Sequence, residues 1–205
     1  MIRHAKKAID TDTRKQASTE VRKTVEGIID DIETRGDAAV RELSERFDKW
    51  SPESFRLSEA EVAAALDAVA PETIEDIKFA QGQIRNFAQI QREALQDVEV
   101  ETLPGIVLGH KNIPITSVGC YVPGGRYPMV ASAQMSIVTA KAAGCEHVIA
   151  CTPPMDGKAH PETIAAMHLA GADEIYLLGG VQAVASMALG AVGMRPVDMI
   201  VGPGN

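Results

Sequence analysis

Three glycine-rich turns, each directly after a short apolar run, constrain the fold of this chain most. They are Pro123-Gly124-Gly125, Gly179-Gly180 and Gly202-Pro203-Gly204. Glycine lets a backbone approach a ligand closely, and the start of a helix presents free N–H groups at a positive dipole end. The apolar runs have the length of strands, and helical patterns follow the first two turns. The pattern therefore predicts a nucleotide or anion crevice at one edge of a parallel sheet.

The second half of the chain alternates between strand-like and helix-like patterns. Strands are predicted over 117–122, 147–151, 175–178 and 198–201, and helices over 131–143, 161–170 and 181–190. Such alternation predicts a parallel sheet with right-handed crossovers and helices on its faces. The third glycine turn is followed by Asn205 and by no helical pattern. We interpret the chain as the front part of a larger protein.

The first half has the pattern of amphipathic, surface-exposed helices. One ends before Gly36, the next is expected to begin with Asp37 as its cap, and another opens at a capping box that starts at Ser58. A long helix is predicted from Pro71 to near Gln96. Between residues 98 and 114 the pattern turns to alternation around Pro104-Gly105, which predicts a short hairpin or linker strand.

Charge divides the chain near residue 115. The first 120 residues carry 22 acidic and 16 basic side chains, and the remainder carry only 6 and 4. We therefore predict two regions: a helical one with a short β segment over 1–115 and an α/β one over 116–205. The overall charge of −8 argues against nucleic acid and anionic membranes as partners. Small-molecule chemistry suits this composition better.

Membrane insertion and secretion are not indicated by the sequence. No apolar run approaches the length of a membrane helix, and the basic N-terminus is followed by no apolar core. The three cysteines, Cys120, Cys145 and Cys151, lie in or beside apolar strand-like runs. Buried, reduced cysteines of a cytoplasmic protein have this distribution.

Three polar side chains at the predicted crevice are candidate ligand contacts. Tyr121 could stack on a cofactor ring or simply pack within its strand. Gln182 lies in the first turn of a predicted helix, where its amide could donate to a ribose or phosphate or face solvent. Asn205 would cap a following helix, which does not exclude ligand contact. The histidines are isolated, and no spacing indicates a metal site or a catalytic triad.

The motifs together resemble the histidinol dehydrogenase family over nearly the whole chain. The resemblance is carried by Arg35-Gly36-Asp37-Ala38-Ala39, Phe47-Asp48, Ile84-Arg85-Asn86-Phe87, Ser117 to Gly125, Ala140 to Gly144, Thr152-Pro153-Pro154, Gly179 to Ala185 and Val201 to Asn205. It implies an α/β fold in which an N-terminal helical region precedes the first half of a Rossmann-like parallel domain. The segment alone is then expected to be inactive.

The resemblance also implies a chemistry. Members of the family are cytoplasmic homodimers that use NAD and a bound zinc ion (Zn2+) to oxidise a primary alcohol through an aldehyde to a carboxylate, in two hydride transfers. Tyr121, Gln182 and Asn205 match the family's NAD-contacting positions. The zinc ligands and the acid–base Glu and His are expected beyond residue 205. No catalytic or metal-binding residue is therefore assigned within this segment.

One departure from the family pattern bears on the substrate. The segment from Arg126 to Met135 looks more like the branch that oxidises 2,3-dihydroxypropane-1-sulfonate (sulfopropanediol). A guanidinium at Arg126 suits a sulfonate, although it could equally face solvent or pair with an NAD phosphate. Ser132 is a second candidate substrate contact. We therefore expect sulfopropanediol as substrate, with L-histidinol as the alternative and an inactive nucleotide-binding fragment or assembly piece as non-enzyme alternatives.

Overall fold

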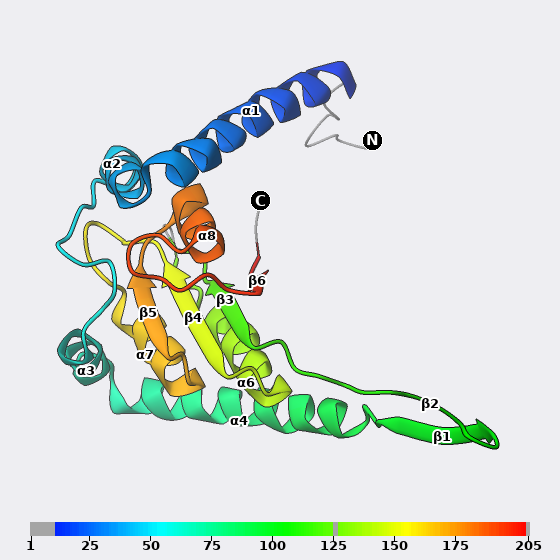
Figure 1. Ribbon diagram of the computed structural model, residues 1–205. Coiled ribbons are helices and arrows are strands. Elements are labelled where there is room, and N and C mark those ends of the chain that lie inside the picture. The colour runs from blue at the N-terminus through cyan, green and yellow to red at the C-terminus, as the bar shows by residue number, and fades with distance from the viewer. Residues whose placement is uncertain (1–10, 125–126, 204–205) are drawn as a thin grey trace, which may run out of the picture.

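A four-stranded parallel sheet forms the centre of the computed structural model, which describes residues 11–124 and 127–203 (Figure 1). Its strands are β3 (Ser117–Tyr121), β4 (His147–Thr152), β5 (Glu174–Leu177) and β6 (Met199–Val201). They lie in the order β5-β4-β3-β6, and every pairing is parallel. Each strand agrees with its predicted range to within one residue at either end. The predicted α/β class is confirmed.

Helices cover both faces of this sheet. The crossovers are α5 (Val130–Ala133), η1 (Gln134–Val138) and α6 (Thr139–Ala143), which together form one helix with a π-helical turn at its centre, then α7 (Pro161–Ala170) and α8 (Gly180–Leu189). Val148 and Ala150 pack with the α5–α7 face, whereas the alternate residues Ile149 and Cys151 pack with α8. Since successive strand side chains point to opposite faces, α8 crosses the sheet on the side away from α6 and α7.

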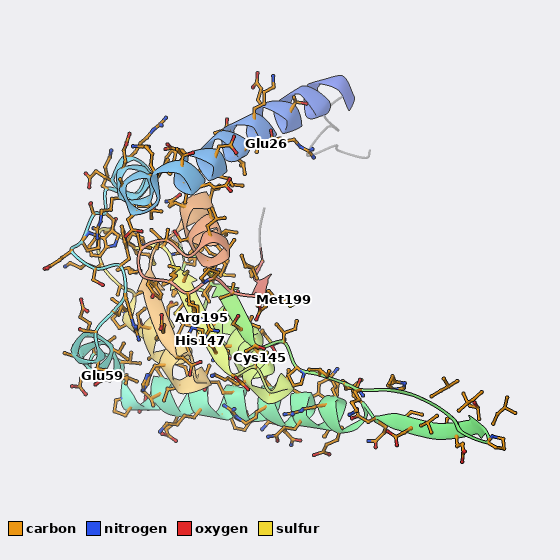
Figure 2. All side chains as sticks on the ribbon, in the orientation of Figure 1. Glu26, Glu59, Cys145, His147, Arg195 and Met199 are labelled. Atoms are coloured by element: carbon orange, nitrogen blue, oxygen red, sulfur yellow. The ribbon has the colours of Figure 1, made fainter. Side chains whose placement is uncertain are left out.

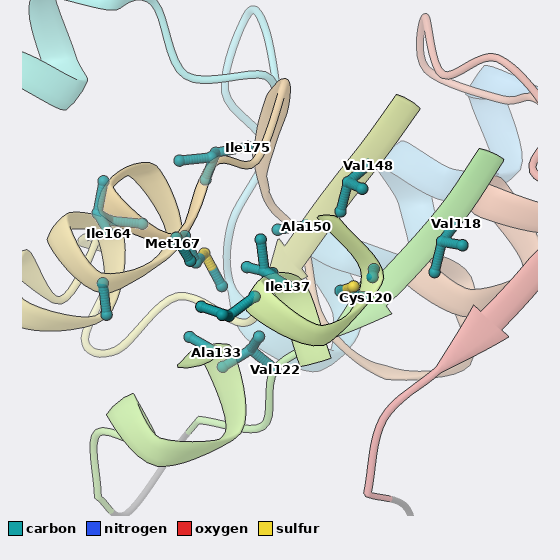
Figure 3. Close-up of a cluster of buried hydrophobic side chains, with 14 of the residues drawn as sticks. Val118, Cys120, Val122, Ala133, Ile137, Val148, Ala150, Ile164, Met167 and Ile175 are labelled. Atoms are coloured by element: carbon teal, nitrogen blue, oxygen red, sulfur yellow. The ribbon is translucent and has the colours of Figure 1, made fainter. Parts of the chain in front are cut away.

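The N-terminal helices share the cores of both faces. They are α1 (Thr11–Arg35), α2 (Asp37–Asp48), α3 (Glu59–Asp67) and α4 (Pro71–Glu93). Ile32 and Val40 pack in the core beneath α8, while Val62 and Ile77 pack in the core beneath α7. Figure 3 shows the second core, where Val118 and Ala150 face Ile137 and Met167. The N-terminal helices are thus placed by the sheet that they cover.

Of the two helix caps predicted from the sequence, the one at the start of α3 is present and the one at the start of α2 is absent. The capping box at α3 is confirmed, because Glu61 N donates to Ser58 Oγ over 3.2 Å and Ser58 N donates to Glu61 Oε2 over 2.7 Å. The expected capping role of Asp37 is wrong. Gly36 occupies the cap position of α2 without any side-chain cap, and Asp37 Oδ1 instead accepts from Val192 N over 2.6 Å.

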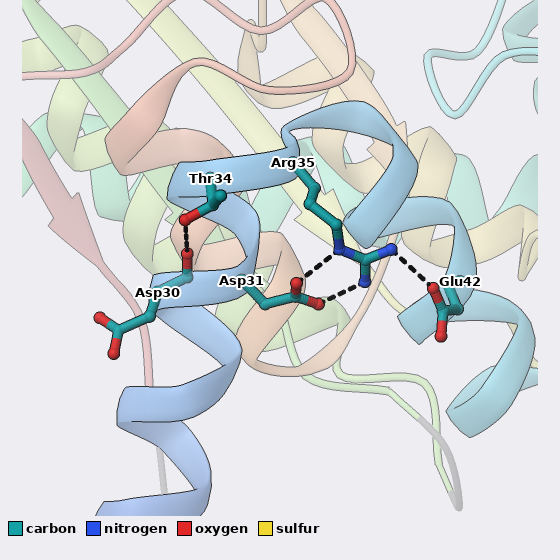
Figure 4. Close-up of polar contacts among 5 residues, drawn as sticks. All are labelled: Asp30, Asp31, Thr34, Arg35 and Glu42. Carbon is teal, nitrogen blue, oxygen red and sulfur yellow. Dashed lines mark hydrogen bonds and ion pairs between the residues drawn. The ribbon is translucent and has the colours of Figure 1, made fainter.

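The corner between α1 and α2 is held by one guanidinium (Figure 4). Arg35 Nε donates to Asp31 Oδ1 over 2.6 Å within α1, and Arg35 Nη1 reaches Glu42 Oε2 on α2 over 2.9 Å. These partners raise the pKa of Arg35 above its usual range. Because the three side chains are largely exposed, the network orients the corner more than it stabilises the fold.

A short segment after α2 closes one edge of the sheet, which the sequence pattern did not indicate. Leu177 N donates to Phe55 O over 2.8 Å, and Leu57 N donates to Ile175 O over 2.9 Å. Arg56 therefore pairs antiparallel with Tyr176 along the outer side of β5. Covering an edge strand in this way removes a row of unpaired backbone groups.

The predicted hairpin between residues 98 and 114 is confirmed as β1 (Val98–Leu103) and β2 (Ile106–His110), joined at Pro104-Gly105. Every residue of both strands is exposed, and Figure 2 shows their side chains with no other ribbon beside them. The paired positions Val100–Leu108 and Leu103–Ile106 give it an apolar face. Among the described residues, no helix has the length and apolarity to cross a bilayer.

Candidate functional site: the switch point of the parallel sheet

The strand order creates a crevice between β3 and β6. From β3 the chain moves outward through β4 and β5, and it then crosses back to pair β6 with the other side of β3. Crossovers leave this point on opposite faces, so the carboxyl ends of β3 and β6 are not covered by a shared helix. Ligands of open α/β sheets bind at such a switch point. The two strand ends here are Tyr121 and Val201.

A cavity of about 590 Å³ opens at this point. It is bounded by the ends of β3 and β6, by one face of α8 along its length and by Val25 and Ile29 of α1. Its lining residues are Val25, Ile29, Tyr121, Gly180, Val181, Val184, Ala185, Ala188, Leu189, Ile200, Val201, Gly202 and Pro203. The walls are apolar apart from the Tyr121 hydroxyl and backbone groups. Such a cavity suits a flat ring held by a few polar contacts.

Tyr121 provides the polar side chain of the cavity wall. Its hydroxyl oxygen accepts a hydrogen bond of 3.2 Å from Gly180 N, so the phenolic proton is free to be donated to a ligand. Burial raises the pKa of the Tyr121 phenol, the hydrogen bond from Gly180 opposes that rise, and the neighbouring charge of Asp48 adds to it. At neutral pH Tyr121 is therefore a hydrogen-bond donor and not a base.

The turn between β5 and α8 places Gly180 and Val181, the first residues of α8, in the cavity wall. Helix α8 has no side-chain cap and no acidic residue in its first turn, so its positive end is not neutralised by its own residues. Gly180 has φ of +67°, a region that favours glycine. At Gly179, a Cβ would come within 2.5 Å of Pro153 Cβ. Close packing on the loop after β4 therefore requires a glycine there.

Gln182 lies behind this turn and not in the cavity wall. Its side chain is only 1% exposed, and its Nε2 donates to Asp48 Oδ2 over 3.1 Å. Burial raises the pKa of Asp48, and the hydrogen bond from Gln182 opposes that rise. Sequence reasoning placed Gln182 in the first turn of α8, which is correct, but it did not foresee Asp48 as the partner.

The remaining predicted contacts, Asn205, Arg126 and Ser132, are not found in the cavity wall among the described residues. Asn205 and Arg126 lie outside the described residues. Ser132 lies in α5, is half-buried, and its backbone carbonyl accepts from Ser136 Oγ over 2.7 Å. It is not among the residues that line the cavity at Tyr121.

Metal-binding groups do not gather in the part of the chain that the structure describes. No three His, Cys, Asp or Glu side chains there could hold one ion together. Cys120, Cys145 and Cys151 are buried free thiols, and burial raises the pKa of each. They are therefore inert core residues at neutral pH.

The fold and the crevice define an open parallel α/β protein with a cavity, the candidate ligand site, at the switch point of its sheet. Comparison with known proteins narrows this class. The family model described as histidinol dehydrogenase matches residues 11–205, and the chain belongs to that family of dehydrogenases. The crystal structure of histidinol dehydrogenase from Elizabethkingia anophelis has a similar fold, with a TM-score of 0.84 and 31% identity over 99% of this chain and 44% of that one.

Two curated relatives bear on the substrate. A histidinol dehydrogenase homolog of Shouchella clausii is 55% identical over all of this chain and 48% of its own length. A sulfopropanediol 3-dehydrogenase of Ruegeria pomeroyi is 45% identical over 94% of this chain and 44% of its own length. The chain thus spans about half the length of the relatives it matches. The expected preference for the sulfonate branch is not favoured, because the relative of higher identity is named a histidinol dehydrogenase homolog and not a sulfopropanediol dehydrogenase.

Proposed function

We propose that the full-length protein containing this chain is an NAD-dependent dehydrogenase that oxidises L-histidinol to L-histidine in two hydride transfers. The observation that supports this most is the switch-point cavity, which joins the Tyr121 hydroxyl to the uncapped start of α8. Family membership and the similarity to a solved histidinol dehydrogenase support the substrate. When bound, NAD supplies the hydride acceptor.

The residues present fit a dinucleotide. The first N–H groups of α8 carry the positive end of the helix dipole and suit a pyrophosphate. Tyr121 can donate its phenolic proton to a ribose or phosphate oxygen, because its own oxygen already accepts from Gly180. Apolar side chains such as Val184 and Ile200 exclude water from a ring placed between α8 and β6. In this proposal the segment binds and orients the cofactor.

Gln182 and Asn205 stay predictions as NAD contacts, as do Arg126 and Ser132 as substrate contacts. For Gln182, contact with NAD requires a side chain that is 1% exposed to reach the ligand past Gly180. Its oxygen is the atom that would do so, because its nitrogen is held by Asp48.

Among the described residues, no three His, Cys, Asp or Glu side chains lie where they could hold a zinc ion together. The prediction that its ligands and the acid–base Glu and His lie beyond residue 205 rests on the family resemblance. A cytoplasmic location, a homodimeric state and a boundary near residue 115 are likewise proposals for the whole protein.

Sulfopropanediol is the second candidate substrate, favoured by the 45% identity to the Ruegeria pomeroyi enzyme. The test is NADH production by the complete gene product with zinc, with L-histidinol and sulfopropanediol assayed side by side. Turnover of histidinol with little on the sulfonate supports the proposal. The reverse result replaces it with the second candidate, and binding of NAD without turnover of either leaves the nucleotide-binding alternative.

A further inference from the structure

The last residue of α2 reaches the first turn of α8 across 134 positions of sequence. Asp48 Oδ2 accepts from Gln182 Nε2 over 3.1 Å. A carboxylate can only accept hydrogen bonds, so the amide must turn its NH₂ toward Asp48. The amide oxygen then faces away, and a Cβ on Gly180 would lie 2.7 Å from it. Asp48 therefore decides which end of the Gln182 amide lies against the glycine turn.

Two further side chains hold the same turn from other directions. Trp50 Nε1 donates to Leu177 O over 3.0 Å, at the end of β5. Tyr121, from β3, accepts from Gly180 N over 3.2 Å. Asp48 and Trp50 both lie where α2 ends, so the N-terminal helical region places two polar groups on the β5–α8 turn. Neither of them lines the cavity at Tyr121.

We propose that Asp48 is a positioning residue for the cofactor: it holds the Gln182 amide against Gly180 and so fixes the start of α8 in the shape that binds NAD. This inference rests on the proposed function. Asp48 acts through Gln182 and does not itself touch the ligand. The N-terminal helical region is therefore a working part of the cofactor site and not only a cover for the sheet.

The chain offers a matched control on the same helix. Asp37, at the start of α2, accepts from Val192 N over 2.6 Å, just beyond the other end of α8. Removing either carboxylate removes one hydrogen bond between α2 and the α8 region. Only Asp48 connects to the glycine turn. Loss of stability alone therefore affects both variants, whereas loss of cofactor positioning affects one.

The test measures NAD affinity by isothermal titration calorimetry in the full-length protein and in the variants Asp48→Ala, Asp48→Asn, Gln182→Ala, Asp48→Ala with Gln182→Ala, and Asp37→Ala. We expect Asp48→Ala to weaken NAD about tenfold, the effect of one hydrogen bond to a charged group. Gln182→Ala should weaken it at least as much, and the double variant no further. Asp48→Asn should stay within about threefold, since an amide oxygen accepts the same bond. Asp37→Ala should leave the affinity unchanged.

Unchanged affinity in Asp48→Ala, or losses that add in the double variant, would overturn the proposal. A second readout separates its failure from failure of the proposed function. Hydrogen exchange of the α8 peptide should quicken at residues 180–183 in Asp48→Ala and not in Asp37→Ala, with or without NAD. If the wild-type protein binds no NAD, the proposed function fails. Equal hydrogen-exchange rates at residues 180–183 in Asp48→Ala and Asp37→Ala would overturn the role of Asp48, whether or not NAD binds.

Discussion

Ser117 and Asp198 fix the register of β6 against β3 through reciprocal hydrogen bonds. Ser117 Oγ donates to Asp198 Oδ2 over 2.7 Å, Ser117 N donates to the same oxygen over 3.0 Å, and Asp198 N donates back to Ser117 Oγ over 3.0 Å. The pair lies at the starts of the two strands whose other ends form the cavity. The register that pairs Cys120 with Val201 beside the crevice is therefore supported by a contact at the opposite end of the sheet.

This pair predicts a loss of stability in acid. The hydrogen bonds from the Ser117 hydroxyl and backbone N–H lower the pKa of Asp198 from its ordinary 3.8. A carboxyl group whose pKa is lower in the folded than in the unfolded chain stabilises the fold at pH values above its unfolded pKa. This stabilisation is lost as the pH falls from the unfolded pKa to the folded pKa. Urea unfolding of the wild type and Asp198→Asn at a series of pH values should show a difference that shrinks in this interval. In a Ser117→Ala background the difference should depend less on pH, because only the backbone N–H of residue 117 still donates to the carboxylate.

Asp48 predicts a pH dependence of the opposite sign. Burial raises its pKa above the ordinary 3.8, so the folded chain holds a proton there more tightly than the unfolded chain does. Its contribution to the free energy of unfolding should therefore decrease as the pH rises from 3.8 to the folded value. Urea unfolding of the wild type against Asp48→Asn isolates this contribution. A contribution that grows with rising pH over that interval would contradict the assigned burial.

Gly180→Ala should destabilise the protein more than a matched glycine change elsewhere. Gly180 and Gly105 have φ of +67° and +82°, so alanine at either costs about 1–2 kcal/mol in backbone strain. At Gly105 a Cβ meets nothing within 4 Å, whereas at Gly180 it lies 2.7 Å from Gln182 Oε1. That oxygen cannot simply swing away, because Asp48 holds the amide. In chemical denaturation, Gly180→Ala should have a lower free energy of unfolding than Gly105→Ala. Equal losses would show that the Gln182 amide moves aside without cost.

Tyr121→Phe should weaken NAD binding and leave the fold intact. The change keeps the ring in the cavity wall, but it removes the acceptor of the Gly180 N–H and the phenolic donor proposed for the ligand. We expect the KM for NAD to rise about tenfold, in proportion to the loss of a hydrogen bond. Tyr127→Phe is the control, since Tyr127 is 73% exposed and does not line the cavity. Equal KM values for NAD in the two variants would show that the Tyr121 hydroxyl does not contribute to NAD binding.

The order of strands and helices in the second half could be predicted because glycine and proline mark nearly every boundary there. The capping box at Ser58 was equally readable, since both of its partners lie within four residues. The orientation of the Gln182 side chain could not be predicted. It is set by the hydrogen bond to Asp48, which lies in α2, and the sequence does not show where α2 packs. Pairing of Arg56 with Tyr176 was missed for the same reason. Contacts between distant segments follow from the packing of α2 and leave no local pattern.

The antiparallel segment at Arg56 covers one edge of the sheet, so the two edges differ in whether they can pair with a further strand. With the outer side of β5 already paired, the described sheet can accept another strand only beside β6. Any strand that enters there, from this protein or from another molecule, arrives next to the cavity at Tyr121. The open edge of the described sheet and one wall of the crevice are therefore the same strand, so a strand added to this sheet would lie against that wall.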